Sequence, residues 1–148
     1  MSRVHSLFKT IYMKTEIKIM AAFLAAAMCA DNVCGRDEEE MLVQIAESYE
    51  VPATELLEHV HVWTKKFQDL TNEQRLNCLS LQGIDVPAAE KSLIFDCVLD
   101  ILMSDSVLTR SEVDFMLSVA EQLCIRPVDA VLLLADYIRD CTALAIEY

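Results

Sequence analysis

The sequence predicts an all-α fold of about seven helices, built as two three-helix repeats that are joined by a linking helix. Two observations predict the helices: the 148 residues include only two Gly and three Pro, and apolar residues recur at helical spacing. So few turn-forming residues argue against an all-β chain with many tight turns. A third observation, an internal repeat, predicts how the helices are arranged.

The chain aligns with itself when it is shifted by 74 positions, from Asp31 to Asp105. Segment 31–38 (Asp-Asn-Val-Cys-Gly-Arg-Asp-Glu) then falls on 105–112 (Asp-Ser-Val-Leu-Thr-Arg-Ser-Glu). Apolar positions on both sides coincide as well, at the i, i+1, i+4, i+5 spacing of amphipathic helices. With one extra residue, Pro52 falls on Pro127. The match predicts two copies of one helical unit, related by a pseudo-two-fold axis.

Each repeat is predicted to hold three helices. The first repeat, roughly 14–68, has them at about 14–30, 36–49 and 52–68, and the second, roughly 87–145, at about 87–103, 110–124 and 127–145. Pro52 and Pro127 suit the first position of a helix, where the missing N–H costs nothing. Thr71 and Gln74 match a capping box that would start the linking helix, roughly 72–82. Because a three-helix half is marginal alone, we expect one domain, 1–148, with a shared core.

The charge of the chain excludes one class of partner. Twelve basic and 24 acidic residues give a net charge of −12, which would repel a phosphate backbone, so we expect no nucleic-acid binding. The first 20 residues are basic and the rest is strongly acidic. An acidic surface of this kind attracts a cation or a basic partner, although it also serves solubility alone.

The cysteine pattern predicts reduced thiols. None of the six cysteines forms a C-x-x-C pair, which argues against zinc and redox motifs. Most fall on predicted apolar helix faces, where Cys acts as a small hydrophobic residue. We therefore expect a cytoplasmic setting. The six are Cys29, Cys34, Cys78, Cys97, Cys124 and Cys141.

The segment from Met13 to Ala30 has two interpretations. Its two lysines, apolar run and small residues resemble a signal peptide, which would mean export. The run is shorter than the roughly 20 apolar residues that a transmembrane helix needs, so we expect no direct insertion into a membrane. The repeat favours the second interpretation, in which this segment is a core helix.

Four acidic residues recur at the turns between the first and second helices of each repeat: Asp31 and Glu38, and Asp105 and Glu112. If the two halves face each other, the four carboxylates converge and need a cation. Hard oxygen ligands suit Ca²⁺, Mg²⁺ or Mn²⁺. The hypothesis is a divalent-cation site made of these four residues.

The same acidic residues also fit a purely structural role. Acidic groups are favoured at helix N-termini, and Thr109 with Glu112 matches a capping box. Asp31 and Asp105 suit turns in which a side chain bonds to the backbone. The two roles are compatible, and the sequence leaves both open.

No motif predicts catalysis. The chain has no G-x-S-x-G, no Gly-rich phosphate loop and no H-E-x-x-H, and the step from Asp to Glu is too short for an EF-hand. His59 and His61 are two residues apart and so point to different helix faces, which argues against a His-based metal site. We expect a protein that is not an enzyme and that has no cofactor other than a cation.

The doubled turns Ala30-Asp31 to Glu38 and Ser104-Asp105 to Glu112, each between apolar helices, resemble those of the TerB-like, tellurite-resistance family. The resemblance covers roughly 14–140. It implies an all-helical cytoplasmic stress-response protein that binds metal, often linked to membrane-associated protein partners, and without catalytic activity. Asp31, Glu38, Asp105 and Glu112 would be its acidic cluster.

The chain departs from this family pattern after each Asp. The Gly that is typical there is Asn32 in the first turn and Ser106 in the second. Gly adopts a positive φ freely, Asn tolerates it and Ser less so, so the second turn is expected to differ in shape. Two functions follow: a TerB-like cation-binding domain associated with tellurite or metal stress, or a helical protein–protein interaction module whose acidic turns only cap helices.

Overall fold

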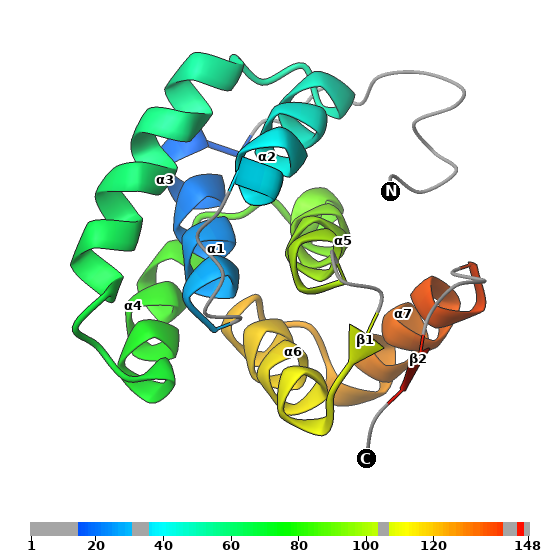
Figure 1. Ribbon diagram of the computed structural model, residues 1–148. Coiled ribbons are helices and arrows are strands. Elements are labelled where there is room, and N and C mark those ends of the chain that lie inside the picture. Colours follow the sequence, from blue (N-terminus) through cyan, green and yellow to red (C-terminus); the bar gives the residue numbers. More distant parts are fainter. Residues whose placement is uncertain (1–14, 31–35, 104–106, 141–144, 147–148) are drawn as a thin grey trace.

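The computed structural model describes residues 15–30, 36–103, 107–140 and 145–146. These residues confirm the predicted all-α class (Figure 1). The described α-helices are α1 (Ile17–Ala30), α2 (Arg36–Ser48), α3 (Ala53–Phe67), α4 (Asn72–Ile84), α5 (Lys91–Leu102), α6 (Arg110–Gln122) and α7 (Pro127–Asp140).

Helices α1 and α5 form the centre of the bundle, where they contact each other (Figure 1). Residues 19–29 of α1 and 94–102 of α5 are buried without a break. A helix that is apolar on all sides has to be covered all round. α1 also contacts α3, α4 and α6, which cover it, so the apolar run after Lys18 is a core helix, as the repeat predicted.

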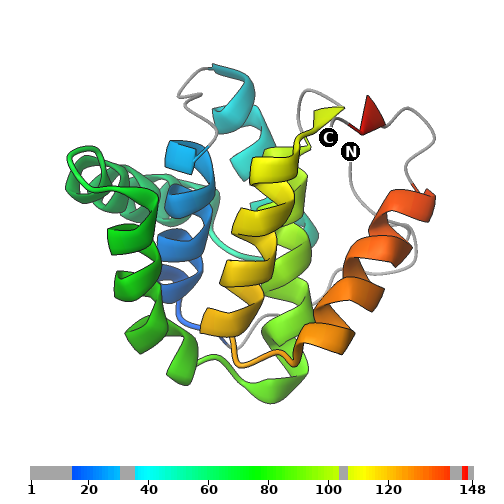
Figure 2. The ribbon, with the colours of Figure 1, turned by 90° about the horizontal axis from the view of Figure 1, so that it is seen from below.

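The helix starts follow the predicted repeat. Ile17 and Lys91, Arg36 and Arg110, and Ala53 and Pro127 begin corresponding helices, and the members of each pair are 74 positions apart. Both views place α3 and α7 on opposite flanks of the bundle (Figure 2). The packing is less symmetric, because α3 packs against both α1 and α2, whereas α7 packs chiefly against α6. The pseudo-two-fold axis itself stays a prediction.

Several boundaries differ from those predicted. Pro52 is the residue before α3, not its first residue, so α3 and α7 align without the extra residue that we inferred from the prolines. A 3₁₀ turn, Ala88–Glu90, precedes α5. Two short strands, β1 (Val107–Leu108) and β2 (Ala145–Ile146), pair in parallel. The described part of α7 ends at Asp140, and the predicted helix end at 145 falls in β2. The strand pair was not predicted, because two residues carry no detectable alternation.

A buried carboxylate and an indole secure the start of α1. Glu90 accepts hydrogen bonds from the backbone N–H of Thr15, at 2.7 Å, and from the Thr15 hydroxyl, and both residues are buried. The indole N–H of Trp63 on α3 donates to the carbonyl of Lys18 at 3.0 Å. These bonds tie the N-terminal end of α1 to α3 and to the 3₁₀ turn that precedes α5.

Candidate functional site

The four predicted metal ligands are described only in part. Asp31 and Asp105 lie outside the described residues. Glu38 is the third residue of α2, with its side chain outside the description, and Glu112 is the third residue of α6. The structure therefore gives the two glutamates the same helical position. Convergence of the four carboxylates stays a prediction.

The described part of the second turn forms a capping box. The N–H and the hydroxyl of Thr109 donate to Glu112 Oε1 at 2.9 and 3.1 Å, and the Glu112 N–H donates to Thr109 Oγ1 at 3.2 Å. Such bonds satisfy backbone groups that the first turn of a helix leaves without partners. Capping by Glu112 is thereby confirmed.

The helix ends that flank the two acidic turns lie at one end of the bundle. Figure 2 shows the C-terminal ends of α1 and α5 and the N-terminal ends of α2 and α6 at the same, upper end. A helix N-terminus carries a partial positive charge that favours nearby acidic groups. The bundle thus presents two helix N-termini, each with a glutamate in the third position, on one side of the molecule.

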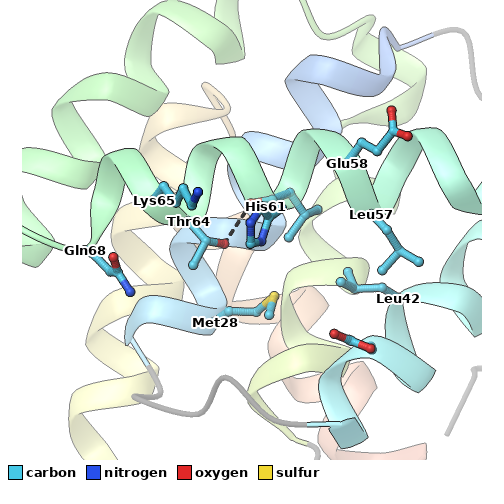
Figure 3. A pocket seen from close by; sticks show the side chains of 10 residues that line it. Met28, Leu42, Leu57, Glu58, His61, Thr64, Lys65 and Gln68 are labelled. Atoms are coloured by element: carbon cyan, nitrogen blue, oxygen red, sulfur yellow. Dashed lines mark hydrogen bonds between the residues drawn. The ribbon is translucent and has the colours of Figure 1, made fainter.

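A surface groove of about 580 Å³ opens beside the C-terminal end of α1 and the N-terminal end of α2 (Figure 3). Its apolar lining comes from three helices: Met28 of α1, Leu42 of α2, and Leu57 and Val60 of α3. Its polar lining consists of Glu39, Glu58, His61, Thr64, Lys65 and Gln68. The Thr64 hydroxyl donates to the Val60 carbonyl at 2.7 Å within α3. The volume lies within the roughly 300–1,000 Å³ of ligand pockets in proteins.

Charge is unevenly distributed along this α1–α3 groove. A second hollow of about 490 Å³ shares Glu39 and Leu57 with it and adds Glu40. The exposed carboxylates of Glu39, Glu40 and Glu58 therefore border the joined hollows. Figure 3 shows Glu58 and Lys65 at separate positions along α3, with His61 between them. The groove has an acidic end and, farther along α3, a basic side chain.

No sequence pattern predicted this groove. Residues 58, 61, 65 and 68 recur at helical spacing along one line of α3, which was the available signal. That spacing predicts an exposed helix face but not that α2 stands far enough away to leave a hollow.

Buried polar side chains also link Tyr49, just after α2, with α5 and α7. Asp96 and Asp100 of α5 are buried, and the hydroxyl of Tyr137 donates to Asp100 Oδ1 at 2.6 Å. Tyr49, the residue after α2, and Cys97 are hydrogen-bonded to each other. Burial, with the charges of Asp96 and Asp100 nearby, raises the pKa of the Cys97 thiol well above its ordinary value. Burial likewise raises the pKa of Tyr49, so both groups stay protonated at neutral pH.

The fold and the groove define a small all-helical domain with a partly apolar, charge-edged surface site. No protein-family model matches the chain, and comparisons with curated proteins and with solved structures found no match. Among the described residues, no three His, Cys, Asp or Glu side chains are grouped so that they could hold a metal ion. None of the described helices has the length and apolar character needed to span a membrane.

Proposed function

We propose that this chain is a non-enzymatic interaction domain that binds a protein partner in the α1–α3 groove. The observation that carries the proposal is the groove itself, with an apolar lining from three helices and charged side chains along its edges. Interfaces gain most of their binding energy where an apolar anchor fills a pocket that excludes water. Capping of α6 by Glu112 gives that carboxylate a structural role, which fits a domain that works through its surface.

A peptide-display selection tests this proposal. Random 12-residue peptides are selected on the full chain, and the selected peptides are measured against Leu57→Gln, which makes the groove lining polar. The control is Val131→Gln on α7, where Val131 is 54% exposed outside the groove. We expect binding that Leu57→Gln abolishes and Val131→Gln leaves intact, with both variants folded by circular dichroism. Peptides that ignore Leu57, or no peptides at all, would contradict the proposal.

A second candidate is the TerB-like function, in which Asp31, Glu38, Asp105 and Glu112 bind Ca²⁺, Mg²⁺ or Mn²⁺ in a response to tellurite or metal stress. What favours it is the position of Glu38 and Glu112, third in two helices whose N-termini lie at the same end of the bundle. Calorimetric titration of wild type and of Asp31→Asn/Asp105→Asn with each ion tests it. Binding at 100 times Kd should stabilise the fold by about 2.7 kcal/mol. The absence of heat and of a thermal shift in wild type rejects it.

The proposed setting is the cytoplasm, with a partner that is membrane-associated. The described part of the chain supports reducing conditions, since Cys78, Cys97 and Cys124 form no disulfide bond there. Fractionation of native cells, with mass spectrometry of the chain, tests the setting. Recovery from the cytosol or from the cytoplasmic face of a membrane is expected, and recovery of an exported form that lacks about 30 residues would show the export that a signal peptide predicts.

A further inference from the structure

We infer that the α1–α3 groove takes a cationic amphipathic segment, with an apolar side chain against Met28, Leu42 and Leu57 and a Lys or Arg side chain beside Glu39, Glu40 and Glu58. The inference rests on the proposed function and specifies the chemistry of the partner. Both the site and the class of partner differ from those of the acidic turns, which were predicted to bind a divalent cation.

The apolar half of the inference comes from the groove lining. Leu42 and Val60 are nearly fully buried, Met28 is 6% exposed, and Leu57 is half-buried. These side chains form a lining that one or two apolar side chains of a partner would cover. Each Å² of apolar surface removed from water contributes roughly 25 cal/mol, so such an anchor supplies affinity without directional bonds.

The preference for a cationic partner follows from three carboxylates at the edge of the joined hollows. Glu39, Glu40 and Glu58 are exposed at the edge of the joined hollows, and none of them forms an ion pair among the described residues. Opposite charges across an interface raise the association rate and exclude partners of the wrong charge. Lys65, the basic side chain among the described lining residues, lies farther along α3 (Figure 3). Three carboxylates therefore border the joined hollows, against one lysine among the described lining residues.

Other occupants fit the charges less well. A second copy of the chain would bring a net charge of −12 against the same sign. Among the described lining residues, only Lys65 and His61 would attract an anionic ligand, which would also have to approach the carboxylates. The neighbouring Lys66 stands over the ring of Trp63, 4.8 Å from its centroid, and does not line the groove. A segment that carries both apolar and cationic side chains is complementary to the apolar lining and the carboxylates of the groove.

Two synthetic peptides of 12 residues test the charge directly. Both carry Leu at positions i, i+3, i+4 and i+7, and they differ only in four flanking residues, which are Lys in one peptide and Glu in the other. Fluorescence anisotropy at low and high salt measures their dissociation constants with the full chain. We expect the Lys peptide to bind at least about tenfold more tightly, with the difference shrinking as salt is added.

Charge reversal in the protein completes the experiment. Glu39→Lys/Glu58→Lys should invert the preference, so that the Glu peptide binds more tightly. Asp114→Lys/Glu121→Lys, at exposed positions of α6 outside the groove, makes the same change in net charge and should leave the preference as it is. If both pairs of substitutions act equally, the attraction is a property of the whole chain, and the inference is overturned.

The result also separates this inference from the proposed function. Peptides that bind in a Leu57-dependent way but prefer neutral or acidic flanks would overturn the cationic partner and leave the groove as an interaction site. The absence of any Leu57-dependent peptide, designed or selected, would remove both.

Discussion

Glu50 and Cys124, 74 positions apart, hold the same left-handed backbone conformation just after the second helix of their repeat, with φ of 53° and 58°. The residue after each of them bonds back to its helix: the Val51 N–H donates to the Ala46 carbonyl at 2.8 Å, and the Ile125 N–H donates to the Ala120 carbonyl at 2.9 Å. This is the Schellman helix ending, in which a left-handed residue allows the chain to turn back. The same ending at matching positions is what the predicted repeat requires.

Glycine at either position should stabilise the fold. A left-handed residue with a Cβ costs roughly 1–2 kcal/mol, and Gly removes this cost while losing about 0.5–1 kcal/mol of chain entropy. Glu50→Gly and Cys124→Gly should each raise the free energy of unfolding by up to about 1.5 kcal/mol in urea titrations. Glu47→Gly, inside α2, is the control and should lower it by about 1 kcal/mol. Destabilisation in all three would show that the positive φ carries no strain.

Gly83→Ala should destabilise the protein although Ala is the better helix former. Gly83 lies near the end of α4, where a Cβ would come 2.0 Å from the carbonyl oxygen of Gln122 in α6. Helix propensity alone predicts a gain of about 1 kcal/mol, but overpacking against a backbone atom costs typically 1–3 kcal/mol. We expect a net loss and a lower thermal midpoint, with the exposed Asn77→Ala in the same helix as the control. A net gain would mean that the two helices separate easily.

Removing the N-cap hydroxyl of α6 should weaken the fold by about 1 kcal/mol, the usual effect of Thr→Ala at this position. Thr109→Ala removes the acceptor of the Glu112 N–H bond, and Thr71→Ala removes the matching acceptor of the Gln74 N–H at α4. Chemical denaturation should give similar losses for the two variants. A much larger loss at Thr109 would indicate that its turn supports more than a helix cap.

Glu112→Gln separates capping from cation binding. The amide oxygen of Gln can accept the same bonds from Thr109, as Gln74 does from Thr71 in the capping box of α4. The free energy of unfolding should therefore change by less than about 0.5 kcal/mol. If the four acidic residues hold an ion, the same variant should lose most of its calorimetric affinity for Ca²⁺, Mg²⁺ or Mn²⁺. Unchanged affinity would leave Glu112 as a cap only.

Alkaline pH should destabilise the protein through Cys97 and Tyr49. Their folded pKa values are raised above the ordinary 9.0 and 10.0, so above about pH 9 the unfolded chain releases protons that the folded chain keeps. The free energy of unfolding should then fall with rising pH, by up to about 1.4 kcal/mol per unit for each group. Urea titrations from pH 7 to 10.5 measure this slope. Cys97→Ala should reduce the slope and Cys124→Ala, which removes an exposed thiol, serves as the control; equal slopes would contradict the prediction.

Local patterns predicted most of the helices closely. The first turns of α4 and α6 begin at the capping boxes read from Thr71 and Thr109, and both boxes are present. On α3, Leu56, Val60 and Phe67 are buried, whereas Leu57 and Trp63 are only partly buried. Apolar spacing identifies a helix face but not its edge, where Leu57 lines the groove.

The amino-acid sequence by itself determined the all-helical class, the starts of α2, α4, α6 and α7, and the capping of α4 and α6, because each depends on residues within one or two turns of one another. Only the tertiary structure decided that α2 and α3 leave a groove, that Gly83 meets Gln122, and that Asp100 is buried against Tyr137. These features depend on the distances and angles between helices that are far apart in the chain. Such geometry follows from the packing of whole helix surfaces, which no short sequence pattern contains.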